Sequence, residues 1–195
     1  MSGLRRFVGA APTPPPPPPP AADELCEFCR AVAGPGHGHV VDTERRSLLC
    51  SCRPCYLLFA YDSGRYRAVP DRYEAGKRLS AIEWEGLGIP VGSAFFLRGE
   101  QGTTAFYPSP AGATECLLNL DAWRLLGAKY PTLTAALPEV EAILVHDGEC
   151  FLVPVDACYE LVGLVRTHWK GFDGGAEAHR RIDEFFAAIR ARAHG

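Results

Sequence analysis

The first cysteines of the chain have the residue types and the spacing of a metal site. Cys26 and Cys29 form one C-x2-C pair, and Cys52 and Cys55 form a second. Each pair makes a tight turn that directs two thiolates at one ion, and the segment between the pairs returns the chain to complete a tetrahedron. Pro54 stiffens the second turn. The spacing therefore predicts that these four cysteines bind one metal ion.

Three other side chains in the same stretch are possible alternate ligands. Cys50 can replace Cys52, although this choice leaves a wider spacing before Cys55. His37 and His39 lie on a glycine-rich stretch that can fold over the ion. Either histidine can complete a site of three cysteines and one histidine. The sequence alone leaves open which four of these seven candidates are ligands.

Zinc is the predicted ion, because it suits a site of four thiolates and needs no redox partner. A single iron in a rubredoxin-like site would use the same spacing. Rubredoxin turns usually carry glycine after the second cysteine, whereas Arg30 and Tyr56 occupy those positions here. An iron–sulfur cluster that uses Cys50 in place of Cys52 is a further alternative.

The rest of the chain has no recognisable catalytic motif. Cys116, Cys150 and Cys158 lie within apolar runs, where free cysteine is a common core residue. Ser109 is not surrounded by a nucleophile elbow, and no phosphate loop or H-E-x-x-H sequence is present. A non-catalytic role is therefore favoured, although the sequence leaves open whether the protein is an enzyme.

Composition narrows the class of partner and the compartment. The net charge of −3 and the pI of about 6.1 argue against a nucleic-acid or anionic-membrane partner. No apolar run approaches the roughly 18 residues of a membrane span. The apolar stretch after Arg5 and Arg6 is too short for an export signal. We therefore expect a cytoplasmic protein with reduced cysteines.

The chain is expected to have three parts. Residues 1–23 are predicted to be a disordered proline-rich tail, since Pro14–Pro20 must adopt a polyproline II helix. Residues 24–60 are predicted to form a zinc-ribbon-like module. Its strands are expected at residues 40–41 and 47–49, with a third strand at residues 56–61.

Residues 61–195 are predicted to form an α+β domain, in which a mixed sheet packs against C-terminal helices. Alternating and β-branched runs indicate strands, and capped amphipathic runs indicate helices. Strands are expected at residues 66–69, 91–97, 103–107, 140–145 and 150–155. Helices are expected at residues 121–130, after Asp156, and at residues 176–192.

Two places are candidate partner surfaces. The run Phe106–Glu115 contains two prolines and a glycine, which predict a rigid loop after a strand. Such a loop can display Tyr107, Ser109 and Glu115 to another protein. Trp169 lies in a cationic, aromatic helix end, and tryptophan is frequent at the centre of interfaces. The alternative, which the residues favour, is that both places are structural: a corner at the first, and side chains that close the core at the second.

Several motifs resemble those of one uncharacterised bacterial family, which is encoded beside the structural and maturation genes of high-affinity nickel–iron hydrogenases. The resemblance covers nearly the whole chain. Its motifs are Gly3–Phe7, Cys26–Cys29, His37–Asp42, Leu48–Cys55, Phe106–Glu115 and Asp156–Gly163. It implies a role in assembling, maturing or serving the hydrogenase, and it implies no reaction.

Two functional hypotheses follow. In the first, the protein is a non-catalytic, metal-binding accessory protein that contacts a hydrogenase subunit or maturation factor. In the second, it is a small electron-transfer protein with a cysteine-ligated iron or iron–sulfur centre. A third hypothesis, an enzyme that uses the segment from Tyr107 to Glu115, has less support from the residues.

Overall fold

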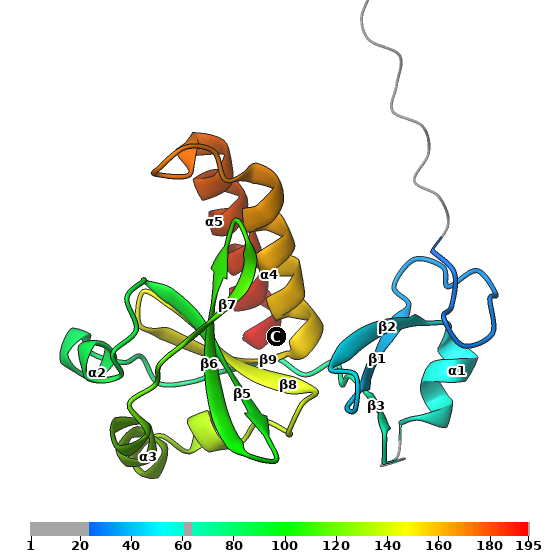
Figure 1. Cartoon of the computed structure of the whole chain (residues 1–195), viewed down its shortest axis with the longest axis horizontal. Helices are drawn as coiled ribbons and strands as arrows, with labels where there is room; N and C mark the ends of the chain where they lie inside the picture. The colour runs from blue at the N-terminus through cyan, green and yellow to red at the C-terminus, as the bar shows by residue number, and fades with distance from the viewer. Residues whose placement is uncertain (1–23, 61–63, 195) are drawn as a thin grey trace, which may run out of the picture.

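The computed structural model describes residues 24–60 and 64–194. The tail expected at residues 1–23 lies outside the described residues. Within them the chain forms a three-stranded sheet, in the order β2-β1-β3, and a six-stranded sheet, in the order β4-β9-β8-β5-β6-β7. We call these the small sheet and the large sheet. The predicted α+β class is confirmed, and Figure 1 shows the small sheet to the right of the large sheet. The four clustered cysteines lie beside the small sheet, because the backbone N–H of Glu27, next to Cys26, donates to Cys50 O in one of its strands.

The small sheet is built on a hairpin. Strands β1 (Gly38–Asp42) and β2 (Ser47–Ser51) pair antiparallel, as the sequence predicts. Asp42 organises the turn, because its carboxylate accepts hydrogen bonds from the backbone N–H groups of Glu44 and Arg45. Strand β3 (Tyr66–Ala68) pairs with the other edge of β1, beyond the expected module boundary at residue 60.

The third strand expected at residues 56–61 is wrong. Helix α1 (Arg53–Leu58) occupies residues 56–58, a turn follows at residues 59–60, and residue 61 lies outside the described residues. Pro54 lies in its first turn, where a fixed φ favours the helix and no N–H is needed. The backbone N–H of Tyr56 donates to Cys52 O at 2.9 Å, so the second C-x2-C pair leads directly into the helix.

The large sheet is antiparallel in every pairing. Its central strands form two hairpins, and the sequence predicted the four strands of these hairpins to within a few residues. The strands are β4 (Glu74–Ala75), β5 (Ser93–Gly99), β6 (Gly102–Ser109), β7 (Gly112–Cys116), β8 (Glu141–His146) and β9 (Glu149–Pro154).

The segment Phe106–Glu115 is a hairpin, and the prediction of a rigid loop is wrong. It contains the end of β6, a tight turn and most of β7. The Ser109 hydroxyl closes the turn: it lies 2.9 Å from both Gly112 O and Thr114 Oγ1. Pro108 fits because this end of the ladder belongs to an edge hairpin, where one lost donor is tolerated.

Helices cover both faces of the large sheet. The pair α4 (Val155–His168) and α5 (Gly175–Ala193) packs on one face around Leu144 and Phe186. Helices α2 (Ala81–Gly86) and α3 (Leu120–Lys129) pack on the other face, together with the 3-10 helix η1 (Pro131–Thr134). Strand β8 is therefore apolar on both sides, because its alternate residues enter two different cores.

Two helix starts differ from the sequence prediction. Helix α3 is capped by Asn119, whose side-chain oxygen accepts from Ala122 N at 3.2 Å, and Asp121 lies inside the first turn. Helix α4 begins at Val155, with Asp156 in its first turn. Asp156 therefore projects from the positive end of the helix dipole, where a carboxylate is favoured.

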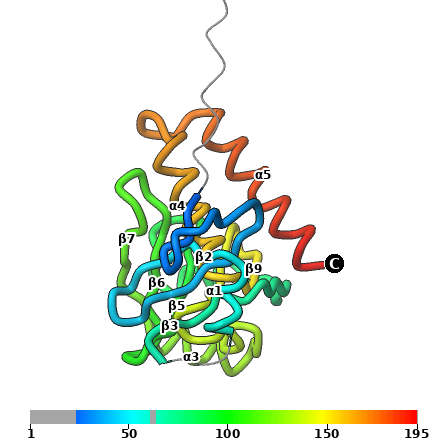
Figure 2. Tube along the Cα trace, turned by 90° about the vertical axis from the view of Figure 1, so that its right-hand side faces the viewer, coloured from blue at the N-terminus to red at the C-terminus, as the bar shows by residue number. Residues whose placement is uncertain are grey.

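The small sheet packs beside the start of α4. One apolar cluster joins the two parts. Val41 of β1 and Val69, which follows β3, pack there against Val140, which precedes β8, and Val155, the first residue of α4. Figure 2, seen from the right of Figure 1, shows the small sheet and α1 in front of the large sheet. In the described part of the chain, no helix has both the length and the apolar character needed to cross a membrane.

Candidate metal centre

Local backbone geometry brings the first cysteine pair into a turn. The backbone N–H of Cys26 donates to Ala31 O, and that of Arg30 donates to Cys26 O, both at 2.8 Å. Arg30 has a φ of 65°, in the left-handed region that glycine favours. It occupies the position where rubredoxin turns carry glycine, and it adopts the conformation that such a glycine permits.

The four cysteines of the two C-x2-C pairs come together in space, and we call them the four-cysteine centre. Their sulfur atoms all lie within 4.8 Å of one another, and Cys29 Sγ is 3.6 Å from Cys52 Sγ. A tetrahedral zinc ion with bonds of about 2.3 Å would separate its sulfur ligands by about 3.8 Å. None of these thiols is in a disulfide. The four cysteines therefore can hold one metal ion.

The electrostatics of the four-cysteine centre favour a cation. Burial by itself raises the pKa of Cys26, but hydrogen bonds from backbone N–H groups, chiefly that of Cys52, lower it to about 6. The neighbouring sulfur of Cys29, followed by burial, raises the pKa of Cys55 to about 12. The Cys26 thiolate is thus easily formed, whereas the neighbouring sulfur atoms and burial oppose deprotonation of Cys55. A bound dication supplies the charge that four thiolates require.

The other three candidate ligands form a separate group. One side-chain atom from each of His37, His39 and Cys50 lies within 4.8 Å of the other two. We call this group the two-histidine site. The seven candidates, which the sequence could not sort, thus divide into four cysteines and a group of two histidines and one cysteine. Which ion binds, and through which ligands, stays a prediction.

One family model matches the chain, over residues 25–193, and it describes DUF5947, a family of unknown function. The protein belongs to this family. The matched segment contains both groups of candidate ligands and both C-terminal helices. Comparisons with curated proteins and with solved structures gave no match. Since the family description names no role, the link to hydrogenases stays a proposal.

The remaining cysteines of this DUF5947 protein occupy apolar surroundings, as expected. Cys150 and Cys158 are buried in the cores on opposite faces of the large sheet. Burial raises the pKa of Cys150 to about 11, and it raises the pKa of Cys158 further. Burial also raises the pKa of the half-buried Cys116. These thiols are protonated at neutral pH and therefore are poor nucleophiles.

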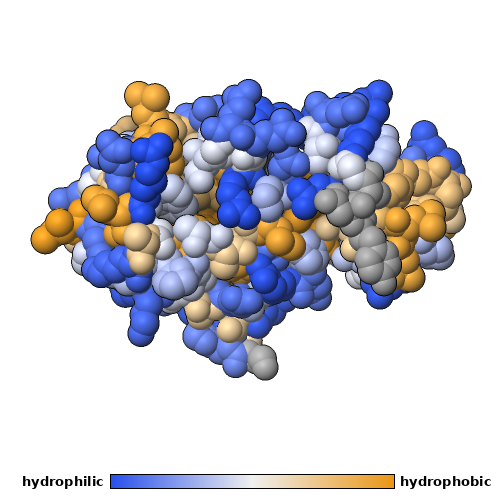
Figure 3. Space-filling model, turned by 90° about the horizontal axis from the view of Figure 1, so that it is seen from below, coloured by the Kyte–Doolittle hydropathy of each residue, from blue (hydrophilic) through white to orange (hydrophobic). Residues whose placement is uncertain are grey.

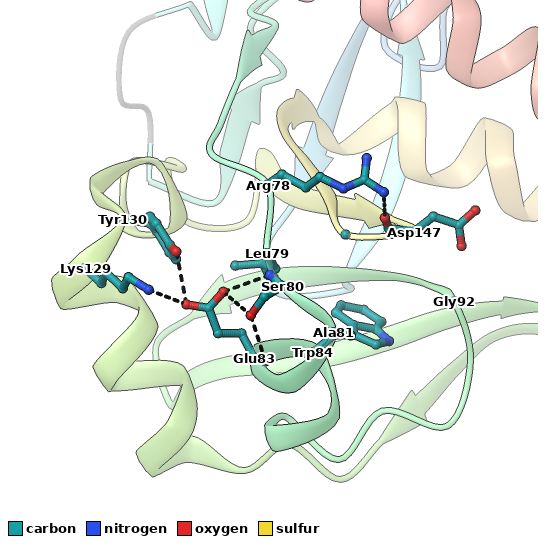
Figure 4. A pocket seen from close by; sticks show the side chains of 11 residues that line it. Arg78, Leu79, Ser80, Ala81, Glu83, Trp84, Gly92, Lys129, Tyr130 and Asp147 are labelled. Atoms are coloured by element: carbon teal, nitrogen blue, oxygen red, sulfur yellow. Dashed lines mark hydrogen bonds and ion pairs between the residues drawn. The ribbon is translucent and has the colours of Figure 1, made fainter.

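A surface cavity of about 670 Å³ lies between α2, α3 and the β8–β9 turn (Figure 4). The carboxylate of Glu83 faces it and accepts hydrogen bonds from Lys129 Nζ at 2.6 Å and Tyr130 Oη at 3.0 Å. The Lys129 ammonium is the main reason that the pKa of Glu83 falls to about 2. The same carboxylate completes the α2 capping box with Ser80. Glu83 therefore joins α2 to α3 and has a structural role.

The sequence prediction missed this cavity. The sequence did contain a signal for helix α2, which borders it, because Ser80-Ala-Ile-Glu83 has the pattern of a capping box. The contact between Glu83 and Lys129 depends on how two helices pack, so spacing along the chain could not reveal it.

Serine and histidine also meet at one end of the large sheet. Ser93 Oγ lies 2.6 Å from His146 Nδ1, across the β5–β8 pairing. The His146 ring stacks on Phe186, and burial lowers its pKa. The nearest carboxylate oxygen, of the exposed Asp147, is 3.7 Å from His146 Nε2. Since that contact is too long for a hydrogen bond, no carboxylate in the described part of the chain orients His146 as the third member of a catalytic triad would.

The residues expected at partner surfaces lie in two places. Tyr107 and Ser109 are half-buried on β6, and Glu115 is exposed on β7. Glu115 borders a groove of about 330 Å³ between the two sheets. Trp169 is half-buried at the end of α4, and a Cβ added at Gly174 would lie 2.8 Å from its ring. Its contacts support a packing role in closing the turn between α4 and α5.

Proposed function

We propose that this protein is a non-catalytic accessory protein whose N-terminal module is held together by zinc. The observation that carries the proposal is the convergence of four cysteine sulfurs within 4.8 Å. Zinc matches this donor set and needs no electron partner. Thiols must stay reduced to bind it, which fits a cytoplasmic location.

The module needs this stabilisation because it buries little apolar surface. Helix α1 has no buried residue, and Val40 and Val41 are the only buried apolar residues in the described strands of the small sheet. Small domains of this kind often depend on a metal for folding. A zinc ion in the four-cysteine centre joins the turn before β1 to the start of α1.

We propose further that the protein serves nickel–iron hydrogenase assembly or maturation through protein contacts. The resemblance motivates this role, and exposed apolar side chains give it a physical basis. Leu58 on α1 is 73% exposed, and Phe172 beyond α4 is fully exposed. Figure 3 shows hydrophobic surface at its right-hand end, the end that carries α1 in Figure 1. The acidic net charge favours a protein partner over nucleic acid or an anionic membrane.

Elemental analysis tests the metal part of this proposal. After treatment with a mild chelator, the purified chain should retain about one zinc ion per molecule. Cys29→Ser and Cys55→Ser should lose it and lose the ordered module. Cys116→Ser is the matched control, because Cys116 lies on β7 in the large sheet. A chain that retains zinc without Cys29 and Cys55 would contradict the assignment.

A deletion strain tests the cellular role. Loss of the gene should lower hydrogenase activity or assembly and leave growth on organic carbon unchanged. Complementation with the wild type should restore activity, whereas Leu58→Asp should restore it poorly if α1 contacts the partner. Normal hydrogenase assembly and activity in the deletion strain would rule out this role and leave the zinc assignment intact.

An electron-transfer protein is the second candidate. The four-cysteine geometry also suits iron, and Cys29 is exposed, which would bring a redox centre close to the surface. Arg30 already adopts the backbone conformation of the rubredoxin turn. Visible absorption together with iron in the purified protein would favour this function over the zinc proposal.

A further inference from the structure

The two-histidine site arises from strand register. His39 on β1 lies directly opposite Cys50 on β2 in the antiparallel ladder, so their side chains share one face of the small sheet. His37 lies two residues before His39, immediately ahead of the first residue of β1. The two imidazole rings are 4.9 Å apart, centre to centre. Three metal-binding side chains thus converge without any contribution from the four-cysteine centre.

Hydrogen bonds set the tautomer of both histidines. His39 Nδ1 lies 2.8 Å from Asp156 Oδ2, and His37 Nδ1 lies 3.2 Å from Gly34 O. A carboxylate and a carbonyl oxygen can only accept, so both Nδ1 atoms carry the proton. In a neutral ring this leaves a lone pair on each Nε2. Histidines that bind metals commonly have this arrangement, in which a carboxylate or carbonyl orients the ring.

The Nε2 atom of His37 provides a second, independent observation. It is buried and makes no hydrogen bond in the described structure, although Glu24 Oε2 lies 3.3 Å away. A buried polar atom without a partner is unfavourable, and such atoms often mark the place of a ligand or ion. The carboxylate of Glu24 is mostly exposed and lies close enough to take part in binding.

The site also lies where the two sheets meet. Val41 and Leu48 occupy the same face of the small sheet as His39 and Cys50, and they pack in the cluster that contains Val155. Asp156, which follows Val155, reaches His39 from the first turn of α4. An ion at this place would therefore be bound by the module and oriented by the large-sheet domain.

We propose that His37, His39 and Cys50 bind a second, exchangeable divalent transition-metal ion. Imidazole and thiolate ligands suit ions such as Zn²⁺ and Co²⁺. Three protein ligands leave a fourth position, which Glu24 or water can fill, as in open rather than closed zinc sites. Asp156 is a positioning residue that acts through His39. This proposal is independent of the zinc-stabilised module and adds a site that can release and take up metal.

Cobalt titration of the full chain tests the proposal. The protein is first treated with a mild chelator, and the zinc that remains is measured. Added Co²⁺ should then bind at about one further ion per chain, with the visible bands of a tetrahedral site, while the retained zinc stays bound. Absence of any Co²⁺ binding beyond the retained zinc would overturn the proposal and would mean that His37 and Glu24 form only an ion pair.

Variants separate the two sites. His37→Gln and Cys50→Ser should abolish Co²⁺ binding and keep the zinc of the four-cysteine centre. Asp156→Asn should weaken Co²⁺ binding by about 10- to 100-fold without removing the site. Cys116→Ser should bind Co²⁺ as the wild type does. If Cys50→Ser releases the tightly held zinc, or if His37→Gln binds Co²⁺ normally, the second site is wrong. Cys29→Ser and Cys55→Ser report on the four-cysteine centre, so failure of one site is distinguishable from failure of the other.

Discussion

Arg72 and Glu141 form a two-pronged ion pair that ties the segment after β3 to the first residue of β8. Arg72 Nε lies 2.8 Å from Glu141 Oε1, and Nη2 lies 2.7 Å from Oε2. The carboxylate is fully buried and also accepts a hydrogen bond from the backbone N–H of Leu137 at 2.7 Å. It thereby fixes where strand β8, in the interior of the large sheet, begins.

Removal of the Arg72 side chain should destabilise the folded protein. Arg72→Ala would leave a buried carboxylate without its countercharge, and we expect it to lower the free energy of unfolding by about 3–5 kcal/mol. Arg124→Ala is the control, because Arg124 and its partner Asp121 are both exposed, and it should cost at most about 1 kcal/mol. Urea unfolding of both variants measures the difference, and equal losses would contradict a structural role for the buried pair.

The buried Asp42 predicts a loss of stability in acid. Its hydrogen bonds with Arg65 are the main reason that its pKa falls from 3.8 to about 2. A carboxyl whose pKa is lower in the folded state stabilises the fold above its unfolded pKa, and this contribution disappears as the pH falls. The stability difference between wild type and Asp42→Asn should therefore be constant above about pH 4 and shrink towards pH 2. A difference unaffected by pH in urea unfolding would refute this.

Gly38 is required by close packing. A Cβ at this position would lie 2.3 Å from Tyr56 Cδ2, and Tyr56 is fixed by its hydrogen bond to Val69 O. Gly38→Ala should therefore destabilise the module by about 1–3 kcal/mol. Gly163→Ala, in the middle of α4 with open space around it, should instead stabilise the protein by up to about 1 kcal/mol. Thermal unfolding of both variants should show shifts in opposite directions.

Variants of Trp169 and Phe172 should distinguish a role in packing from a role in contact with a partner protein. Trp169 packs against Gly174, so Trp169→Ala should cost about 1–3 kcal/mol of stability. Phe172 is fully exposed, so Phe172→Ala should change stability by less than about 0.5 kcal/mol. If this end of the molecule contacts a partner, Phe172→Ala should reduce co-purification of that partner. Urea unfolding and pulldown from the same variants decide between the two roles.

Short-range features were readable from the sequence. The two C-x2-C turns depend only on neighbouring residues, and the structure places their four sulfurs together. The strands of the β5–β6 and β8–β9 hairpins follow from apolar, β-rich runs on either side of polar turns. Residues that act within one turn or one hairpin need few long-range contacts, so their pattern suffices to predict them.

Competing local signals misled the prediction at two segments. Residues 56–61 are apolar enough for a strand, but Pro54 and the preceding cysteine turn favour the start of α1. The run Phe106–Glu115 contains prolines that suggested a loop, yet its position in an edge hairpin allows them. At the first segment a local helix start overrode the strand preference, and at the second the tertiary context of the hairpin overrode the loop preference.

Sequence alone determined that the chain has a cluster of metal-binding side chains and an α+β organisation. Only the tertiary structure decided which of those side chains form the four-cysteine centre and which form the two-histidine site. His39 faces Cys50 because of the register between β1 and β2, and it meets Asp156 from 117 positions along the chain. A shift of register by one residue would turn those side chains to the opposite face. Register and helix docking are set by the packing of the whole core, and spacing along the chain does not encode them directly.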